Sequence, residues 1–178
     1  MQRPDDIFIS QKKYVLEVLE RFNLGKCNLV CNPMVHGFKL MKNGDGVRIN
    51  NIFYKQIVGS LMYLTATHPD VMFVVSLISR FMDCPTEVHF QVAKRILRYL
   101  KCTVDFRVFY NKGGSEELIA YIDSDYARDL DERKNTSGYV FMLGSGAVSW
   151  SLKKQPVVAL STTEVEFIAT TSCACQAI

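Results

Sequence analysis

The chain has 178 residues, of which 48% are apolar and 22% are charged, close to the proportions of ordinary globular proteins. This composition argues against a wholly disordered or fibrous chain. No apolar run approaches the ~18–20 residues that a membrane span requires, and the polar first residues lack the apolar segment of a secretory signal. We therefore expect a cytoplasmic or nuclear protein, not a secreted one, with no membrane partner.

The formal net charge of +3 is the sum of a basic first part of the chain and an acidic second part. Residues 1–112 hold 16 basic and 9 acidic residues, a net charge of +7, and residues 113–178 hold 5 basic and 9 acidic residues, a net charge of −4. A basic surface can follow a phosphate backbone, and clustered carboxylates can hold a divalent cation. Two ordinary solvated faces would explain the same distribution.

The six cysteines do not predict a zinc site. Cys27 lies close to Cys31, and Cys173 lies close to Cys175, but the two pairs stand far apart in the sequence. A structural zinc site usually takes four ligands from two tightly spaced pairs. We therefore expect reduced thiols in a reducing compartment.

The apolar pattern of the first half predicts mostly helices. Apolar residues recur every three or four positions in four segments, and a short strand precedes them. The strand is expected at 7–9 and the helices at 11–22, 54–64, 71–81 and from 84–87 onward. Residues 27–50 contain Pro33 and several glycines without a sustained period, which indicates a long connection.

The last of these helices has one basic face, formed by Lys94, Arg95, Arg98 and Lys101. Its other face is apolar and is expected to pack on the remaining helices. The basic strip could lie against nucleic acid. A solvated basic face is the alternative.

In the second half the apolar period changes from 3.6 to 2, which predicts strands. They are expected at 104–110, 118–122, 138–143 and 147–152, with a hairpin turn at 144–146 and a further extended run at 157–160. The run Lys112-Gly113-Gly114-Ser115 predicts a turn and the boundary between the halves. Ser161 and Glu164 have capping-box spacing and open a helix to about Ala177.

Two acidic residues could carry chemistry. Asp123 directly follows the strand predicted at 118–122, and Glu166 lies about one turn into the final helix. If this helix packs beside that strand, the two carboxylates can converge on Mg²⁺, which could activate water for phosphodiester cleavage. The alternative is that the acids are solvated, with Glu164 and Glu166 favoured by the dipole of the helix.

Several long motifs resemble the Pol polyproteins of copia-type LTR retrotransposons. The runs 121–141 and 146–167 resemble their ribonuclease H segment. Four upstream runs, 9–14, 54–64, 68–70 and 93–101, resemble the region that follows the reverse-transcriptase catalytic core. The resemblance covers nearly the whole chain in one order, which makes it specific.

The resemblance implies an α+β or α/β fold. Residues 1–112 would form a mostly helical, thumb- or connection-like region of reverse transcriptase. Residues 113–178 would form an incomplete ribonuclease H-like mixed sheet with one packed helix. The family also implies Mg²⁺, an RNA–DNA hybrid or other nucleic acid as substrate, and the rest of the Pol polyprotein as a partner.

Two of the four acids that the family uses match this sequence. Asp123 matches the aspartate of the first strand, and Glu166 matches the glutamate of the helix, so both are expected to be catalytic and to bind the metal. The resemblance places the other two acids beyond the end of the chain and the reverse-transcriptase aspartates before its start. We therefore expect a Pol fragment with little or no nuclease activity. A nucleic-acid-binding module and a domesticated retroelement protein are the alternatives.

Overall fold

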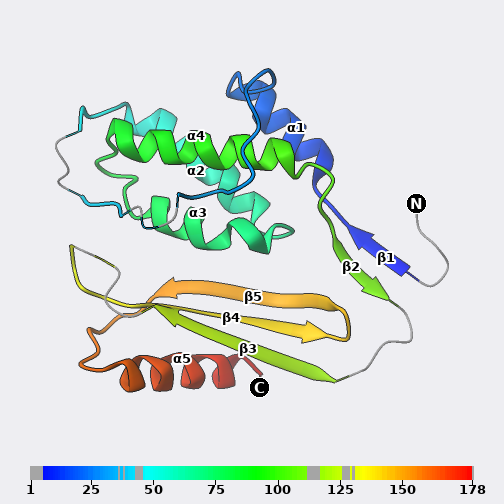
Figure 1. Cartoon of the computed structure of the whole chain (residues 1–178), viewed down its shortest axis with the longest axis vertical. Helices are drawn as coiled ribbons and strands as arrows, with labels where there is room; N and C mark the ends of the chain where they lie inside the picture. Colours follow the sequence, from blue (N-terminus) through cyan, green and yellow to red (C-terminus); the bar gives the residue numbers. More distant parts are fainter. Residues whose placement is uncertain are drawn as a thin grey trace. The chain divides into compact units, whose positions relative to one another are not determined.

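The computed structural model describes residues 6–35, 37, 39–42, 46–111, 117–125, 129 and 131–177. The chain divides into two units (Figure 1). The helical unit comprises Ile9–Arg107, and the sheet unit comprises Met1–Phe8 together with Val108–Ile178. The turn predicted at 112–115, with the boundary placed on it, lies outside the described residues.

The described residues of the helical unit form four α-helices, as the apolar periodicity predicted. They are α1 (Lys12–Arg21), α2 (Asn51–Leu64), α3 (Met72–Ser79) and α4 (Glu87–Cys102). A short 3₁₀ turn, η1 (Pro69–Val71), leads into α3, so the helix predicted over 71–81 is shorter than expected. No helix among the described residues has the length and apolar character needed to cross a membrane.

One continuous apolar core holds the four helices together. Its fully buried side chains include Val15, Val18, Tyr54, Ile57, Leu61, Leu64, Ile78, Ile96, Leu97 and Leu100. The buried hydroxyl of Tyr54 donates a hydrogen bond to the carbonyl oxygen of Ile78 at 2.9 Å, which links α2 to the end of α3. A buried hydroxyl without such an acceptor would cost free energy.

Side chains cap two of these helices at their N-termini. The side chain of Asn50 accepts hydrogen bonds from the backbone N–H groups of Ile52 and Phe53, at 2.9 and 3.2 Å, and begins α2. Thr86 and His89 form a capping box at the start of α4. Both devices satisfy amide groups that a helix leaves without a partner in its first turn.

Three antiparallel strands and one helix dominate the sheet unit. The strands are β3 (Leu118–Asp125), β4 (Thr136–Leu143) and β5 (Gly146–Lys154), in the order β3-β4-β5, and the helix is α5 (Thr162–Ala177). The α+β class is therefore confirmed. The prediction that β3 ends at Ile122 was wrong, because Asp123, Ser124 and Asp125 continue to pair with β4.

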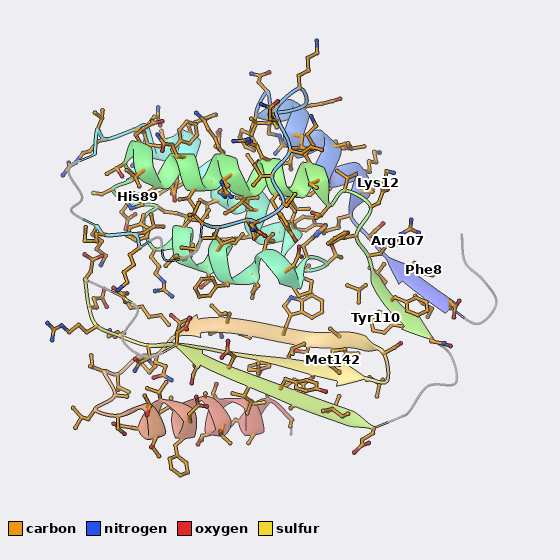
Figure 2. The ribbon with its side chains drawn as sticks, in the orientation of Figure 1. Phe8, Lys12, His89, Arg107, Tyr110 and Met142 are labelled. Atoms are coloured by element: carbon orange, nitrogen blue, oxygen red, sulfur yellow. The ribbon has the colours of Figure 1, made fainter. Side chains whose placement is uncertain are left out.

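A second, two-stranded sheet pairs β1 (Asp6–Ile9), near the N-terminus, with β2 (Val108–Asn111), which follows the helical unit. The rings of Phe8 and Phe109 lie 4.8 Å apart across it. Figure 2 shows Phe8 and Tyr110 on these strands. The strand predicted over 104–110 is shorter because the chain leaves α4 through a turn, in which the N–H of Phe106 donates to the carbonyl of Thr103 at 2.9 Å.

Buried amide groups tie α5 to the end of the sheet. The backbone N–H of Gln155 donates to the carbonyl of Asn135 at 2.8 Å, and the Gln155 side chain donates to the carbonyl of Val165 at 3.2 Å. Gln155 and Asn135 are both almost fully buried. The extended run predicted at 157–160 forms no strand. The chain therefore connects Gln155 to α5 without a further strand.

Gly146 has no room for a side chain, because β2 crosses it closely. A Cβ atom there would collide with the Tyr110 ring and would lie 2.6 Å from the carbonyl oxygen of Phe109.

We expect Gly146→Ala to lower the free energy of unfolding of the sheet unit by about 1–3 kcal/mol. Denaturant titration followed by the fluorescence of Trp150, the single tryptophan, measures this. Gly25→Ala, which meets nothing within 4 Å, should change stability by less than about 0.5 kcal/mol; equal losses would contradict the explanation.

Asp70 gives the helical unit a pH-dependent contribution to stability. Its carboxylate accepts a 2.7 Å hydrogen bond from the Tyr99 hydroxyl, and Nδ1 of His68 lies 3.6 Å from its other oxygen. Burial opposes the ionisation of Asp70, but the contacts with His68 and Tyr99 outweigh it, so the pKa of this carboxyl lies below its usual value. The resulting stabilisation is present above the unfolded pKa of ~4 and is lost as the pH falls through the folded pKa.

We therefore expect Tyr99→Phe to lower the free energy of unfolding by about 1–2 kcal/mol at pH 7. The deficit should shrink as the pH falls and Asp70 becomes protonated in the parent chain. Urea titrations at pH 7 and at successive values below pH ~4 measure this. Tyr63→Phe is the control, because Tyr63 is 61% exposed; a deficit that stays constant with pH would contradict the role of Asp70.

Candidate functional site

The acidic residues predicted to carry chemistry lie on β3 and α5. Asp123 is exposed within β3, where it pairs with Gly138 of β4. Glu166 is exposed on the first half of α5, and its Oε1 accepts a 2.6 Å hydrogen bond from the hydroxyl of Ser124. The predicted packing of α5 beside β3 is therefore present, and it brings Glu166 to the residue that follows Asp123.

The two carboxylates nevertheless belong to opposite faces of the sheet. Side chains alternate between the faces along a strand, and Ser124 faces α5 because it bonds to Glu166. Tyr139 lies on the same face and donates a 3.1 Å hydrogen bond to Gln176 of α5. Asp123 consequently points to the face that α5 does not cover.

The donor set around these acids does not fit a magnesium centre in this arrangement. Mg²⁺ prefers six oxygen ligands in near-octahedral geometry. Within the described part of the chain, no group of three or more His, Cys, Asp or Glu residues is arranged to hold a metal ion. The Asp123 carboxylate on β3 and the Glu166 carboxylate on α5 lie on opposite sides of the sheet, so they do not form a shared site in this arrangement.

Two nearby acids have structural roles instead. Asp129 is bonded to Lys154 and accepts hydrogen bonds from the N–H groups of Asp131 and Glu132. Burial opposes its ionisation, but these contacts are stronger, so the pKa of Asp129 lies below its usual value. Glu164 accepts a 2.7 Å hydrogen bond from the N–H of Leu160 at the start of α5, as expected for an acid that stabilises a helix N-terminus.

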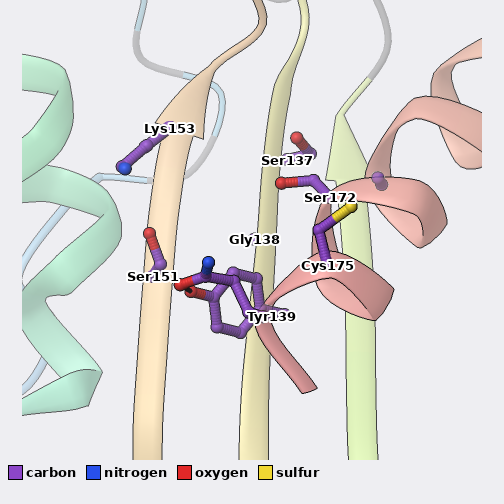
Figure 3. Close-up of a pocket in the computed structure, with 9 residues that line it drawn as sticks. Ser137, Gly138, Tyr139, Ser151, Lys153, Ser172 and Cys175 are labelled. Atoms are coloured by element: carbon purple, nitrogen blue, oxygen red, sulfur yellow. Dashed lines mark hydrogen bonds between the residues drawn. The ribbon is translucent and has the colours of Figure 1, made fainter. Parts of the chain in front are cut away.

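A cavity of about 200 Å³ separates part of α5 from the sheet (Figure 3). Its polar lining includes Ser137, Ser151, Lys153 and Ser172. Among the described residues that line it there is no carboxylate, and Lys153 contributes a positive charge, so this lining does not suit a divalent cation. Its lining residues come from β4, β5 and α5, so it lies on the α5 side of the sheet.

The four basic residues predicted to contact nucleic acid do project from one side of α4, but three of them bind backbone oxygens of the chain itself. Arg95 donates to the carbonyl of Asn32 at 3.1 Å, Arg98 to that of Asn28 at 2.8 Å, and Lys101 to that of Cys27 at 2.8 Å. The Lys94 amine lies 3.9 Å above the centre of the Phe90 ring, a cation–π contact.

These three cations hold residues 27–32 against α4. The segment has no helix or strand of its own, so its carbonyl groups depend on side chains or water for hydrogen bonds. We name this set of contacts the loop clamp. No pattern in the sequence predicts the loop clamp, because every residue carries the same backbone carbonyl acceptor.

The loop clamp predicts a local effect of substitution. Arg98→Gln should remove a charged hydrogen bond and weaken the attachment of residues 27–32 by about 1 kcal/mol, which corresponds to several-fold faster amide exchange. Hydrogen-exchange mass spectrometry of peptides over 24–34 measures this. Lys94→Gln removes the same charge from the same helix without touching the segment and should leave exchange there unchanged. Equal acceleration by both variants would contradict the loop clamp.

Comparison with known proteins agrees with the motifs. The chain is 42% identical over 92% of its length to the retrovirus-related Pol polyprotein from transposon RE1 of Arabidopsis thaliana, and 40% identical over 93% to that from transposon TNT 1-94 of Nicotiana tabacum. It spans 11% and 13% of the lengths of these two proteins. It is also 40% identical to the secreted RxLR effector protein 161 of Plasmopara viticola, over 73% of this chain and 92% of that protein.

No protein-family model matches the chain, and no solved structure matches it. The family therefore rests on the curated relatives. The identity with Pol polyproteins extends through both the helical unit and the sheet unit, as the order of the motifs predicted. The chain belongs to the family of copia-type retrovirus-related Pol polyproteins and matches one segment of its relatives.

Proposed function

We propose that this segment joins a nucleic-acid-contacting helical unit, related to the thumb or connection of reverse transcriptase, to the first part of a ribonuclease H-like domain. We further propose that it does not cleave RNA–DNA hybrids by itself. One observation carries the proposal: three antiparallel strands are followed by a helix that packs on the first of them, with Glu166 bonded to Ser124 beside Asp123. The order of these elements supports the ribonuclease H resemblance.

The ribonuclease H resemblance would place Asp123 and Glu166 in the acidic set of the longer polyprotein, but the two side chains do not converge on one site in this arrangement. Within this chain the opposite orientation of the two side chains supports inactivity. We therefore assign no cleavage step to the described residues.

Charge supports the nucleic-acid part of the proposal. Residues 1–112 carry a net charge of +7, and such an excess favours a phosphate backbone. Lys94, Arg95, Arg98 and Lys101 would add to this field while the last three also hold the loop clamp. The remaining Pol domains are the proposed partners, and the cytoplasm or nucleus is the proposed location.

A separately expressed protein derived from the retroelement is the second candidate. The relative from Plasmopara viticola favours it, because this chain covers 92% of that protein. A product of comparable length can therefore exist outside a full Pol polyprotein. This candidate predicts binding without cleavage, as the first one does.

Cleavage tests the proposal directly. The purified full chain, incubated with an end-labelled RNA–DNA hybrid and Mg²⁺ or Mn²⁺, should cleave no faster than its Asp123→Asn variant. Glu166→Gln should also match the parent, because its side-chain amide oxygen can still accept the bond from Ser124. Metal-dependent cleavage that falls at least about tenfold in both variants, equivalent to a loss of ~1.4 kcal/mol of transition-state stabilisation, would overturn the proposed inactivity.

A further inference from the structure

The cavity between α5 and the sheet is lined by polar side chains that the fold itself does not use. Its volume is about 200 Å³, and its lining comes from β4, β5 and α5, which all belong to the sheet unit. Figure 3 shows Ser151 and Lys153 on β5 and Ser172 on the facing helix. We name this space the α5 cavity.

The pairing of β4 with β5 fixes the floor of the α5 cavity. Ser137 lies opposite Lys153, and Tyr139 lies opposite Ser151 in the same register. Residues two apart on a strand, and residues directly opposite on neighbouring strands, point to one face of a sheet. The Tyr139 hydroxyl donates a 3.1 Å hydrogen bond to Gln176 of α5, so all four side chains face the helix.

The helix α5 supplies the opposite wall. Ala169, Ser172 and Gln176 recur at intervals of three and four residues and therefore lie on one side of the helix. Ala169 is almost fully buried, and Gln176 is bonded to Tyr139. These two contacts turn this side of α5 toward the sheet, so the Ser172 hydroxyl is held opposite the floor of the cavity.

The polar groups of the α5 cavity have unused hydrogen-bonding capacity. Within the described part of the chain, the hydroxyls of Ser137, Ser151 and Ser172 and the amine of Lys153 make no hydrogen bond or ion pair. A serine hydroxyl can donate one hydrogen bond and an ammonium group three. Unused donors therefore surround this space from both the sheet and the helix.

These donors favour a small oxyanion. Hydrogen bonds from an ammonium group to an anionic oxygen are roughly twice as strong as those between neutral groups, whereas a metal ion would meet the like charge of Lys153. The volume lies below the ~300–1,000 Å³ typical of sites for drug-sized ligands. The occupant is therefore limited to a group of about the size of one phosphate.

We propose that the α5 cavity binds a single phosphate group. Lys153 supplies the positive charge, and the hydroxyls of Ser137, Ser151 and Ser172 donate hydrogen bonds to the phosphate oxygens. Free phosphate and the terminal phosphate of a nucleic-acid strand present the same oxygens to these donors. The second of these sources rests on the proposed function, whereas the phosphate chemistry follows from the lining alone.

Cys175 provides a reporter, because its exposed thiol lines the α5 cavity. Alkylation of the full chain by iodoacetamide, read at each cysteine by mass spectrometry, should slow at Cys175 when inorganic phosphate replaces chloride at constant pH and ionic strength. With phosphate at ~10 times its dissociation constant, the rate should fall about tenfold by mass action. Cys84 and Cys102 are exposed thiols outside the cavity, and their rates should not change.

Two substitutions connect the protection to the lining. Lys153→Gln should abolish the protection of Cys175, and Ser151→Ala should raise the phosphate concentration for half-protection about tenfold or more, because it removes a hydrogen bond to a charged group. Lys13→Gln on α1 and Ser149→Ala on β5 are matched controls at exposed positions outside the lining and should retain full protection. A circular-dichroism melt establishes that each variant is folded. Undiminished protection in folded Lys153→Gln would overturn the proposal.

A pair of oligonucleotides distinguishes the two sources. A short single-stranded DNA with a 5′-terminal phosphate is compared with the same strand ending in a 5′-hydroxyl. Protection of Cys175 by the phosphorylated strand and not by its partner would support a terminal phosphate as the ligand. Protection by inorganic phosphate alone would support a free anion. If neither phosphate nor the phosphorylated strand protects Cys175, the proposal is wrong.

The same probes separate this inference from the proposed function. Strands that bind the chain, as measured by fluorescence anisotropy, while Cys175 stays fully reactive with every probe would overturn the α5 cavity as a phosphate site and leave the proposed function standing. Protection by inorganic phosphate without detectable nucleic-acid binding would support the α5 cavity and count against the nucleic-acid role of the helical unit.

Discussion

The helical unit depends on α4, which packs its apolar face on the other helices and hydrogen-bonds residues 27–32 with its basic face. Its buried residues, among them Ile96 and Leu97, pack on the other helices. This packing fixes the direction in which the basic side of α4 faces. Long basic side chains can cover apolar surface with their stems while their charged heads reach polar partners. On α4 these partners are the carbonyl groups of 27–32. One helix therefore orders a segment that has no periodic pattern of its own.

The N-terminus of α4 organises a different part of the unit. The capping box of Thr86 and His89 satisfies amides of the first helical turn, and the His89 ring then stacks on Phe81. Residues 47–49 attach to the same turn through backbone bonds. His89 therefore has a structural role, because its ring joins the start of α4 to the end of α3. The neighbouring charged residues are held in place by the same contacts.

Periodicity predicted most of the elements because burial of one face determines where helices and strands form. It predicted α1, α2, α4 and α5 within a few residues and placed Glu166 in the final helix, but it ended the strand before Asp123, which in fact lies within β3. It could not predict the hydrogen bond between Ser124 and Glu166. The face to which Ser124 points is defined only if β3 continues to pair with β4 as far as this residue. The loop clamp and the hydrogen bond from Gln155 to α5 could not be predicted from the sequence either, because in both cases the acceptors are backbone carbonyl groups.

The pairing of β1 with β2 makes the helical unit an insertion within the sheet unit. Before these strands can pair, the chain must close a loop of about a hundred residues, which carries an entropic cost. Lys12 and Asp105, near the two ends of the helical unit, form a 2.6 Å ion pair. Folding of the helices thus brings the strands together in advance, and a product that started at Val108 would lose the partner of β2.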